Sequence, residues 1–251
     1  MLDQMNLQID VGNTFLKWRA VESGVVVARG GEATGVEGCL ADFTLWRQVK
    51  TIALASVASV EVEVQLLSVL KRFRSDITPF VARTQSSFEG VSCAYSSPDQ
   101  MGVDRWLALV AGYLKYGGSC CVVDCGSAIT VDVINSAGFH KGGYILPGIR
   151  LMKNSLITGT KRVQFESLGA KSVMYGRNTT ECVENGINYM IFSIFDQLRR
   201  RQIREGIDHL FVTGGDAEMV AELCDGVELI PDLVLDGLAL VSEENMKTNN
   251  S

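Results

Sequence analysis

Short apolar or alternating segments, separated by turns that contain glycine, open the chain. Residues 7–10 are strand-like, an alternating stretch follows at 15–21, and a third apolar segment starts at residue 25 after the turn at 22–24. A period of two places every second side chain on one face of a sheet, and glycine turns join neighbouring strands. This opening predicts three consecutive strands, followed by the pair Gly30-Gly31.

The same order of segments recurs after residue 120. Residues 121–124 are strand-like, 129–134 alternate, and a third segment starts at residue 139 and reaches the pair Gly142-Gly143. In both copies the first strand leads into one short motif, which reads Asp10-Val11-Gly12-Asn13 and then Asp124-Cys125-Gly126-Ser127. Because a repeat on this scale marks a duplicated structural unit, we predict two copies of one fold.

Longer segments predict helices and further strands after each set of three strands. In the first half we expect helices near 36–48 and 61–74, strands near 51–57 and 77–82, and a closing helix near 103–116. In the second half we expect helices near 148–157 and 180–204, and strands near 210–212 and 227–230. This alternation predicts an α/β protein with mixed sheets. The glycines at 117–118 stop the last helix of the first half, which predicts domains at 1–117 and 118–251.

Composition and charge argue against several classes of protein. The 251 residues are 47% hydrophobic and 21% charged, as in globular proteins, and the net charge of −6 argues against a protein that coats nucleic acid. The arginines at 199–201 and 204 suit the end of a solvated helix. No apolar run approaches the ~18 residues of a membrane span, and residues 1–20 lack the basic start and apolar block of a signal peptide.

The cysteines suit a reducing compartment. Their number, seven, is odd, and a chain of this length needs no disulfides, so the cytoplasm is the expected location. Cys120, Cys121 and Cys125 flank Val122-Val123 in a predicted buried strand, where cysteine packs as a small apolar residue. With two histidines in the chain and no paired CxxC motif, we expect no zinc site.

The two strand-end motifs carry the groups that nucleotide chemistry needs. Phosphoryl transfer depends on positioning and charge neutralisation, and Asp10 and Asp124 would face a cleft from its two sides and hold Mg²⁺ against phosphates. The other groups are glycines that admit phosphate (Gly12, Gly126), short donors (Asn13, Thr14, Ser127) and a cation (Lys17). One Asp-x-Gly motif is usually only a turn, and Lys17 suits a solvated strand equally well. Two motifs in the same context favour a phosphate site.

Three further motifs lie at the starts of predicted helices. Residues 142–148 and 213–216 lead from a strand into a helix, which suits phosphate or adenosine, or simply a tight turn that needs glycine. The third motif is Gly102-Val103-Asp104-Arg105. An acid in the first helical turn commonly suits the helix dipole, whereas a cation there is mildly unfavourable. Arg105 therefore indicates a function, with Asp104 as general base and Arg105 as anion binder.

As a set, these motifs resemble those of type III pantothenate kinases, which belong to the superfamily of actin, sugar kinases and heat-shock ATPases. The likeness rests on residues 10–17, 102–105, 124–127 and 142–148, in the expected order, and extends to Gly237. It implies two ribonuclease H-like, actin-type domains with mixed sheets around an interdomain cleft. It also implies ATP-dependent phosphorylation of pantothenate at its hydroxymethyl group, the opening step of coenzyme A synthesis.

The resemblance also implies roles for individual residues. ATP would be bound by Asp10, Val11, Gly12, Asn13, Thr14, Phe15, Leu16 and Lys17 of the first phosphate loop, and by Ser127 of the second. Pantothenate would be bound by Tyr95, Gly102, Val103, Asp104, Arg105 and Thr179, with Asp104 as the catalytic base. Asp124 would bind the K⁺ that such enzymes require, or another monovalent cation such as NH₄⁺, beside the Mg²⁺ that accompanies ATP.

Two positions depart from the family's pattern, and two alternative functions stay open. Ser127 stands where threonine is common and keeps the hydroxyl, and Cys93 stands where a polar residue such as asparagine is frequent. Another small-molecule kinase of the superfamily would lack the motif at 102–105. A non-catalytic regulatory relative would have lost Asp104 or Asp124, and both are present.

The predicted helix at 180–204 carries apolar residues on more than one face. A stripe formed by Val183, Ile187, Ile191, Ile194 and Leu198 would face the core. Tyr189, Met190, Phe192 and Phe195 extend beyond that stripe, which predicts burial against a second copy in a homodimer. The alternative is a helix buried entirely within its own domain. The resemblance implies a dimer too, with residues 158–162 closing the partner's pantothenate pocket.

Overall fold

The chain forms two compact units in a computed structural model, which describes residues 5–35, 40, 43–160, 165, 169 and 171–249. The first unit comprises Met1–Phe88, Tyr95–Ala111 and Leu233–Ser251, and the second comprises Glu89–Ala94 and Gly112–Asp232. These units differ from domains cut at 117/118 in two main respects. The segment Glu89–Ala94 groups with the second unit, and the C-terminal helix groups with the first.

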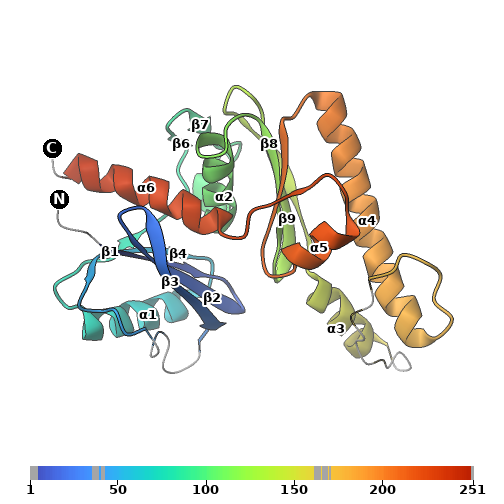
Figure 1. The fold of residues 1–251 in the computed structure, drawn as a ribbon, viewed down its shortest axis with the longest axis horizontal. Helices are drawn as coiled ribbons and strands as arrows, with labels where there is room; N and C mark the ends of the chain where they lie inside the picture. The colour runs from blue at the N-terminus through green and yellow to red at the C-terminus, as the bar shows by residue number, and fades with distance from the viewer. Residues whose placement is uncertain are drawn as a thin grey trace. The chain divides into compact units, whose positions relative to one another are not determined.

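A mixed five-stranded sheet forms the centre of the first unit. Its strands are β1 (Met5–Val11), β2 (Phe15–Glu22), β3 (Val25–Ala33), β4 (Val49–Ser56) and β5 (Phe80–Val81), in the order β3-β2-β1-β4-β5. The first three strands are antiparallel neighbours, and β4 and β5 run parallel to β1. Leu7, Ile9 and Val11 form one apolar core with Leu66 and Leu70 of helix α1 (Val60–Phe73). Figure 1 shows α1 on one side of this sheet and helix α6 (Leu233–Asn249) on the other.

The second unit repeats this sheet, which confirms the predicted duplication. Its strands are β8 (Cys120–Cys125), β9 (Ala128–Ile134), β10 (His140–Pro147), β11 (His209–Thr213) and β12 (Glu228–Leu229), in the order β10-β9-β8-β11-β12. Again three antiparallel strands are followed by two parallel ones. Helices α3 (Ile149–Gly159), α4 (Thr179–Glu205) and α5 (Ala217–Leu223) complete the unit. Both units are therefore α/β with mixed sheets, as predicted.

The stripe predicted along the long helix α4 is confirmed. Ile187, Ile191 and Leu198 are buried in the core of the second unit, and Val183 and Ile194 pack against it. Phe195 is also buried in this core. Its expected place on an outer face was therefore wrong, because the apolar stripe is wide enough to include it.

Two expectations about elements need correction, and several elements were not expected. Residues 43–48 contain no helix, and 36–39 and 41–42 of that expected helix lie outside the described residues. Phe43 and Trp46 instead pack edge to face, with ring centroids 4.8 Å apart, in the core of the first unit. The strand expected near 77–82 is only the short β5. The structure adds α5, α6, the hairpin of β6 (Ser87–Phe88) and β7 (Val91–Ser92), and a 3-10 turn at Pro98–Gln100.

The cysteines of β8 are core residues, as predicted. Cys120, Cys121 and Cys125 are buried, and burial is the main cause that raises the pKa of each thiol, to about 12 for Cys121. All three are free thiols that stay protonated near neutral pH. They therefore act as small apolar side chains.

Helix α6 closes the first unit through a buried polar contact and a tight backbone contact. Asp236 in its first turn accepts from the Arg19 guanidinium on β2 at 2.8 Å. The Arg19 Nε in turn donates to the Gln8 Oε1 on β1 at 2.6 Å. A Cβ atom on Gly237 would collide with the carbonyl oxygen of Leu107 in helix α2 (Val103–Leu114). Within the described residues, no helix is long and apolar enough to cross a membrane.

Candidate functional site

The first phosphate-loop motif forms the closed turn between β1 and β2. Asp10 and Lys17 lie opposite each other in the antiparallel pair. The Gly12 N–H donates to the Phe15 carbonyl at 3.1 Å, and the Thr34 hydroxyl donates to the Gly12 carbonyl at 2.8 Å. A Cβ on Gly12 would lie 3.0 Å from the Phe15 oxygen, so this tight turn suits glycine.

The residues of this turn differ in what they can offer a ligand. Val11 and Leu16 have buried side chains that belong to the apolar core, so only their backbone can face a ligand. Asn13 and Phe15 are exposed, and Asp10 and Lys17 are half-buried. The accessible polar groups of the loop are therefore those of Asp10, Asn13, Thr14 and Lys17.

The motif at 102–105 opens helix α2 in the first unit. The Asp104 Oδ1 accepts from the N–H of Arg105 at 2.8 Å, and the side chain is half-buried. A Cβ on Gly102 would lie only 2.5 Å from that carboxylate oxygen, so glycine leaves room for it. Val103 is buried and anchors the helix start. The carboxylate is thus held near the surface at a fixed position.

Arg105 joins Tyr95 to this motif. Its side chain is almost fully buried, and its Nη1 donates to the Tyr95 hydroxyl at 3.1 Å while the guanidinium carbon lies 5.8 Å from the ring centroid. A buried cation needs polar partners, and the tyrosine supplies one. The structure therefore brings together Tyr95, Gly102, Val103, Asp104 and Arg105.

Val57 connects this cluster to the first phosphate loop, and sequence reasoning did not identify it. Its N–H donates to the Val11 carbonyl at 3.0 Å. Its Cγ1 lies 3.7 Å from the point where a Cβ on Gly102 would stand. Asp104 and the end of β1 are therefore neighbours in one unit. The only signal for Val57 was its place at the end of the strand predicted near 51–57.

The second phosphate-loop motif follows β8 and is held by backbone hydrogen bonds. The Gly126 N–H donates to the Ala128 carbonyl at 3.0 Å, and the Gly148 N–H before α3 donates to the Ser127 carbonyl at 3.2 Å. The Asp216 N–H donates to the Cys125 carbonyl at 2.8 Å. Two helix starts thus meet the loop, as the glycine motifs at 142–148 and 213–216 indicated.

Asp124 and Asp216 place two carboxylates around this loop. A Cβ on Gly214 would collide with the Asp124 Oδ1 and the Cys125 backbone, and Gly214 has a φ of +98°. Burial raises the pKa of Asp216, while Lys153 and Arg150 oppose that shift. Asp216 was not among the predicted site residues, although Thr213-Gly214-Gly215-Asp216 had been recognised as a strand-to-helix turn. Among the residues that the structure describes, no cluster of three His, Cys, Asp or Glu side chains forms a metal site.

Thr179 is the first residue of α4 and is exposed. The Asn178 side chain before it accepts from the Glu181 N–H at 3.0 Å, and the Arg177 N–H donates to the Glu181 carboxylate at 2.7 Å. This reciprocal capping fixes where the helix begins. Thr179, Asp124 and Ser127 belong to the second unit, whereas Tyr95 and residues 102–105 belong to the first.

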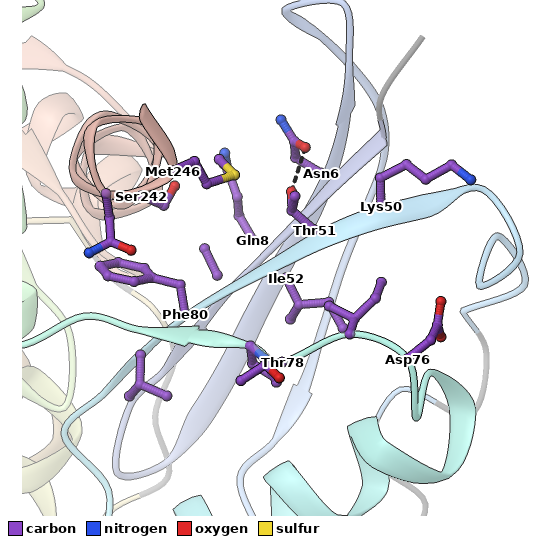
Figure 2. A pocket seen from close by; sticks show the side chains of 15 residues that line it. Asn6, Gln8, Lys50, Thr51, Ile52, Asp76, Thr78, Phe80, Ser242 and Met246 are labelled. Atoms are coloured by element: carbon purple, nitrogen blue, oxygen red, sulfur yellow. Dashed lines mark hydrogen bonds between the residues drawn. The ribbon is translucent and has the colours of Figure 1, made fainter. Parts of the chain in front are cut away.

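A separate pocket of about 560 Å³ lies in the first unit between β1, β4, the segment before β5 and α6. Figure 2 shows its lining, where the Thr51 hydroxyl donates to the Asn6 Oδ1 at 2.5 Å. Asn6, Gln8, Lys50, Thr78, Phe80, Ser242 and Met246 also line it. No residue that the sequence analysis placed in a site lines this pocket, so it is distinct from the predicted site.

Comparison with known proteins gives consistent matches. The family model described as type III pantothenate kinase matches residues 6–201. A curated type III pantothenate kinase from Pseudomonas fluorescens is 35% identical over 248 residues, covering 94% of this chain and 98% of the relative.

Two solved structures share the fold. A conserved Baf family protein from Campylobacter jejuni is 21% identical with a TM-score of 0.61, over 96% of this chain and 99% of the other. A protein described as a 2-dehydro-3-deoxygalactonokinase from Sinorhizobium meliloti is 12% identical with a TM-score of 0.56, over 95% and 96%. At these identities the likeness concerns the fold alone.

Proposed function

We propose that this chain, which belongs to the type III pantothenate kinase family, transfers the γ-phosphate of ATP to the hydroxymethyl group of pantothenate, the first step of coenzyme A biosynthesis. The observation that carries the proposal is the cluster at the start of α2. There a carboxylate, a buried guanidinium and a tyrosine hydroxyl lie together, next to the end of β1. A substrate with a hydroxyl and a carboxylate matches these groups.

Asp104 is the general base in this proposal. The pantothenate hydroxyl is a poor nucleophile, and a carboxylate that accepts its proton assists as the new phosphorus–oxygen bond forms. The Asp104 Oδ1 lies only 2.5 Å from the point where a Cβ on Gly102 would stand, which supports this role because a larger residue at 102 would displace the carboxylate. The half-buried position lets the carboxylate meet a substrate.

Arg105 and Tyr95 bind the anionic end of pantothenate in this proposal. A guanidinium pairs well with a carboxylate and stays charged when buried. Its hydrogen bond to the Tyr95 hydroxyl holds it in one orientation. Gly102, Val103 and Thr179 would contribute the remaining contacts, with Val103 acting through its backbone since its side chain is buried.

ATP is bound by the two phosphate loops in this proposal. The turn from Asp10 to Lys17 offers backbone amides, the donors of Asn13 and Thr14, and a cation, and Ser127 offers a hydroxyl on the second loop. The loops are braced by the backbone hydrogen bonds of Gly12 and Gly126.

Mg²⁺ and a monovalent cation, K⁺ or NH₄⁺, would neutralise phosphate charge. Asp10 and Asp124 would each offer a carboxylate to Mg²⁺, which would take its other ligands from phosphates and water. Asp124, beside backbone carbonyls of its loop, fits K⁺ as well. Replacing K⁺ by Na⁺ should cut the rate strongly, and equal rates in both salts would remove Asp124 from that role.

The test of the function is a coupled assay of ADP release with and without pantothenate, in the presence of Mg²⁺ and K⁺. Release should depend on pantothenate. A hexose or glycerol with a far higher kcat/KM would favour another kinase of the superfamily, and a protein that binds ATP without turnover would favour the regulatory alternative.

A homodimer is the proposed assembly, in the cytoplasm. On α4, Tyr189, Met190 and Phe192 are exposed, and Tyr175 before the helix is 98% exposed. Exposed apolar groups of this size suit burial against a second copy. Of residues 158–162, expected to reach the partner's pocket, Thr158 is exposed and 161–162 lie outside the described residues. Light scattering should give twice 27.3 kDa, and the monomer mass at micromolar concentration would refute the dimer.

A further inference from the structure

The two histidines of the chain each lie beside a carboxylate, but in opposite environments. His209 pairs with Glu228 at 2.8 Å on the surface of the second unit. His140 pairs with Asp132 at 3.0 Å, and both of these side chains are buried, at 0% and 3% exposure. Burying a carboxylate is costly unless it is hydrogen-bonded, so the second pair needs an explanation.

Strand register explains how the buried pair forms. His140 is paired with Ile134 across β10 and β9, and Asp132 lies two residues before Ile134 on the same strand. Side chains two apart share a face, so His140 and Asp132 are diagonal neighbours on one face of the sheet. A register shift between His140 and Gly142 follows, where Gly142 has a φ of +101°.

The hydrogen bonds define which nitrogen of His140 carries the proton. The Ala94 N–H donates to the Nδ1 at 3.4 Å, a long bond that requires an unprotonated Nδ1. The Nε2 therefore carries the hydrogen and donates to the Asp132 Oδ1. Asp132 thus stabilises the tautomer of His140 whose Nδ1 can accept a hydrogen bond from the Ala94 N–H.

The segment that ends at Ala94 is seated on the turn between β9 and β10. The Ser92 N–H donates to the Gly138 carbonyl at 2.8 Å, and Ser92 forms a bridge with Phe139. Gly138 has a φ of +77°, and a Cβ there would collide with the Gly90 carbonyl oxygen. The bond from Ala94 to His140 holds the residue directly before Tyr95.

We propose that Asp132 and His140 are positioning residues for pantothenate binding, which act by fixing the backbone of Ala94 and so the start of Tyr95. Consecutive Cα atoms are held ~3.8 Å apart, so a fixed Ala94 restricts where the Tyr95 hydroxyl can reach. That hydroxyl accepts from Arg105, the proposed partner of the pantothenate carboxylate. This inference rests on the proposed function.

The test is the double variant His140→Phe/Asp132→Val. Changing only one partner would leave a buried polar group unsatisfied, whereas replacing both by apolar groups of similar shape can be nearly neutral for stability. The phenylalanine ring cannot accept from Ala94. We expect the KM for pantothenate to rise about three- to tenfold, the effect of one lost hydrogen bond, with the KM for ATP unchanged.

The matched control is His209→Phe/Glu228→Leu, which removes the exposed pair of the same chemistry. It should leave both KM values unchanged. Hydrogen exchange of the Ala94 amide supplies a readout independent of turnover, and it should become faster in the His140 double variant only.

Several outcomes would overturn the positioning role. They are equal rises in both KM values, an unchanged KM for pantothenate, or unchanged exchange at Ala94. If the double variant does not fold, nitrogen NMR of the wild type decides, because an Nδ1-protonated His140 contradicts the hydrogen bond to Ala94. Wild-type protein that releases no pantothenate-dependent ADP would instead refute the proposed function, and the exchange and NMR results would still report on Ala94.

Discussion

Removing the Asp236 carboxylate should destabilise the first unit, because it leaves the Arg19 cation buried. The Arg19 and Asp236 side chains are 8% and 4% exposed, and their atoms lie 2.8 Å apart. Breaking a buried ion pair by removing one partner typically costs about 3–5 kcal/mol. We expect Asp236→Ala to fall at the lower end of that range, since the Gln8 Oε1 still accepts from Arg19.

Calorimetry and urea unfolding would measure this loss. At about 2–4 °C per kcal/mol for a chain of this size, a loss of about 3 kcal/mol should lower the melting temperature of the first unit by about 6–12 °C. The double variant Arg19→Leu/Asp236→Leu should recover much of that loss, because no charge stays buried.

The control is Asp196→Ala on α4, which removes an exposed pair with Arg200 at 2.8 Å. Such a pair contributes about 0.3–0.5 kcal/mol to stability, so the melting temperature and the urea midpoint should barely change. A change below about 1 kcal/mol for Asp236→Ala would refute the reasoning that α6 is held by this buried contact. So would a double variant that is less stable than the single one.

Two further predictions concern a glycine and a surface carboxylate. Gly214→Ala should lose activity and about 1–3 kcal/mol of stability, because its Cβ would meet Asp124 and the Cys125 backbone at a positive φ. The control is Gly24→Ala, whose Cβ would have nothing within 4 Å. It should lose only about 1 kcal/mol of stability and keep its kcat. Hydrogen bonds from Lys141 and then Arg201 lower the pKa of Glu205 from 4.5 to about 2. The contribution of the ionised Glu205 to folding stability is therefore complete above pH 4.5 and is lost as the pH falls through about 2. The melting temperatures of wild type and Glu205→Gln should therefore differ at pH 6 and converge toward pH 2, and a constant difference would contradict the assignment.

Much of the fold could be predicted because its signals are local. Alternation and glycine turns predicted the first three strands of each sheet, and the repeated Asp-x-Gly motif revealed the duplication. The helix expected near 36–48 failed for a physical reason. Phe43 and Trp46 have a helix-like spacing of three, yet they belong to an aromatic cluster in which Trp18 contacts Phe43 and Phe73 stacks on Trp46.

The C-terminal helix could not be predicted in the same way, because its partners lie far away in the sequence. Asp236 is buried only because Arg19 stands 217 residues earlier, and Gly237 is needed only because Leu107 packs against it. The motifs of the candidate site were recognisable as short patterns. Val57 carries no pattern of its own, and Asp216 lay in a recognised strand-to-helix turn that did not show its carboxylate to be near Asp124.

The most direct test of the account is kcat for pantothenate phosphorylation by Asp104→Asn, measured with the melting temperature on the same preparation. Asparagine keeps the size of the side chain and suits a helix start, so the protein should fold and bind ATP. Loss of a general base should lower kcat by about 10²–10⁴-fold. If Asp104 served only the helix dipole, the variant would lose about 0.3–1 kcal/mol of stability and keep its rate. A kcat within about threefold of wild type would contradict the assignment of Asp104 as the base.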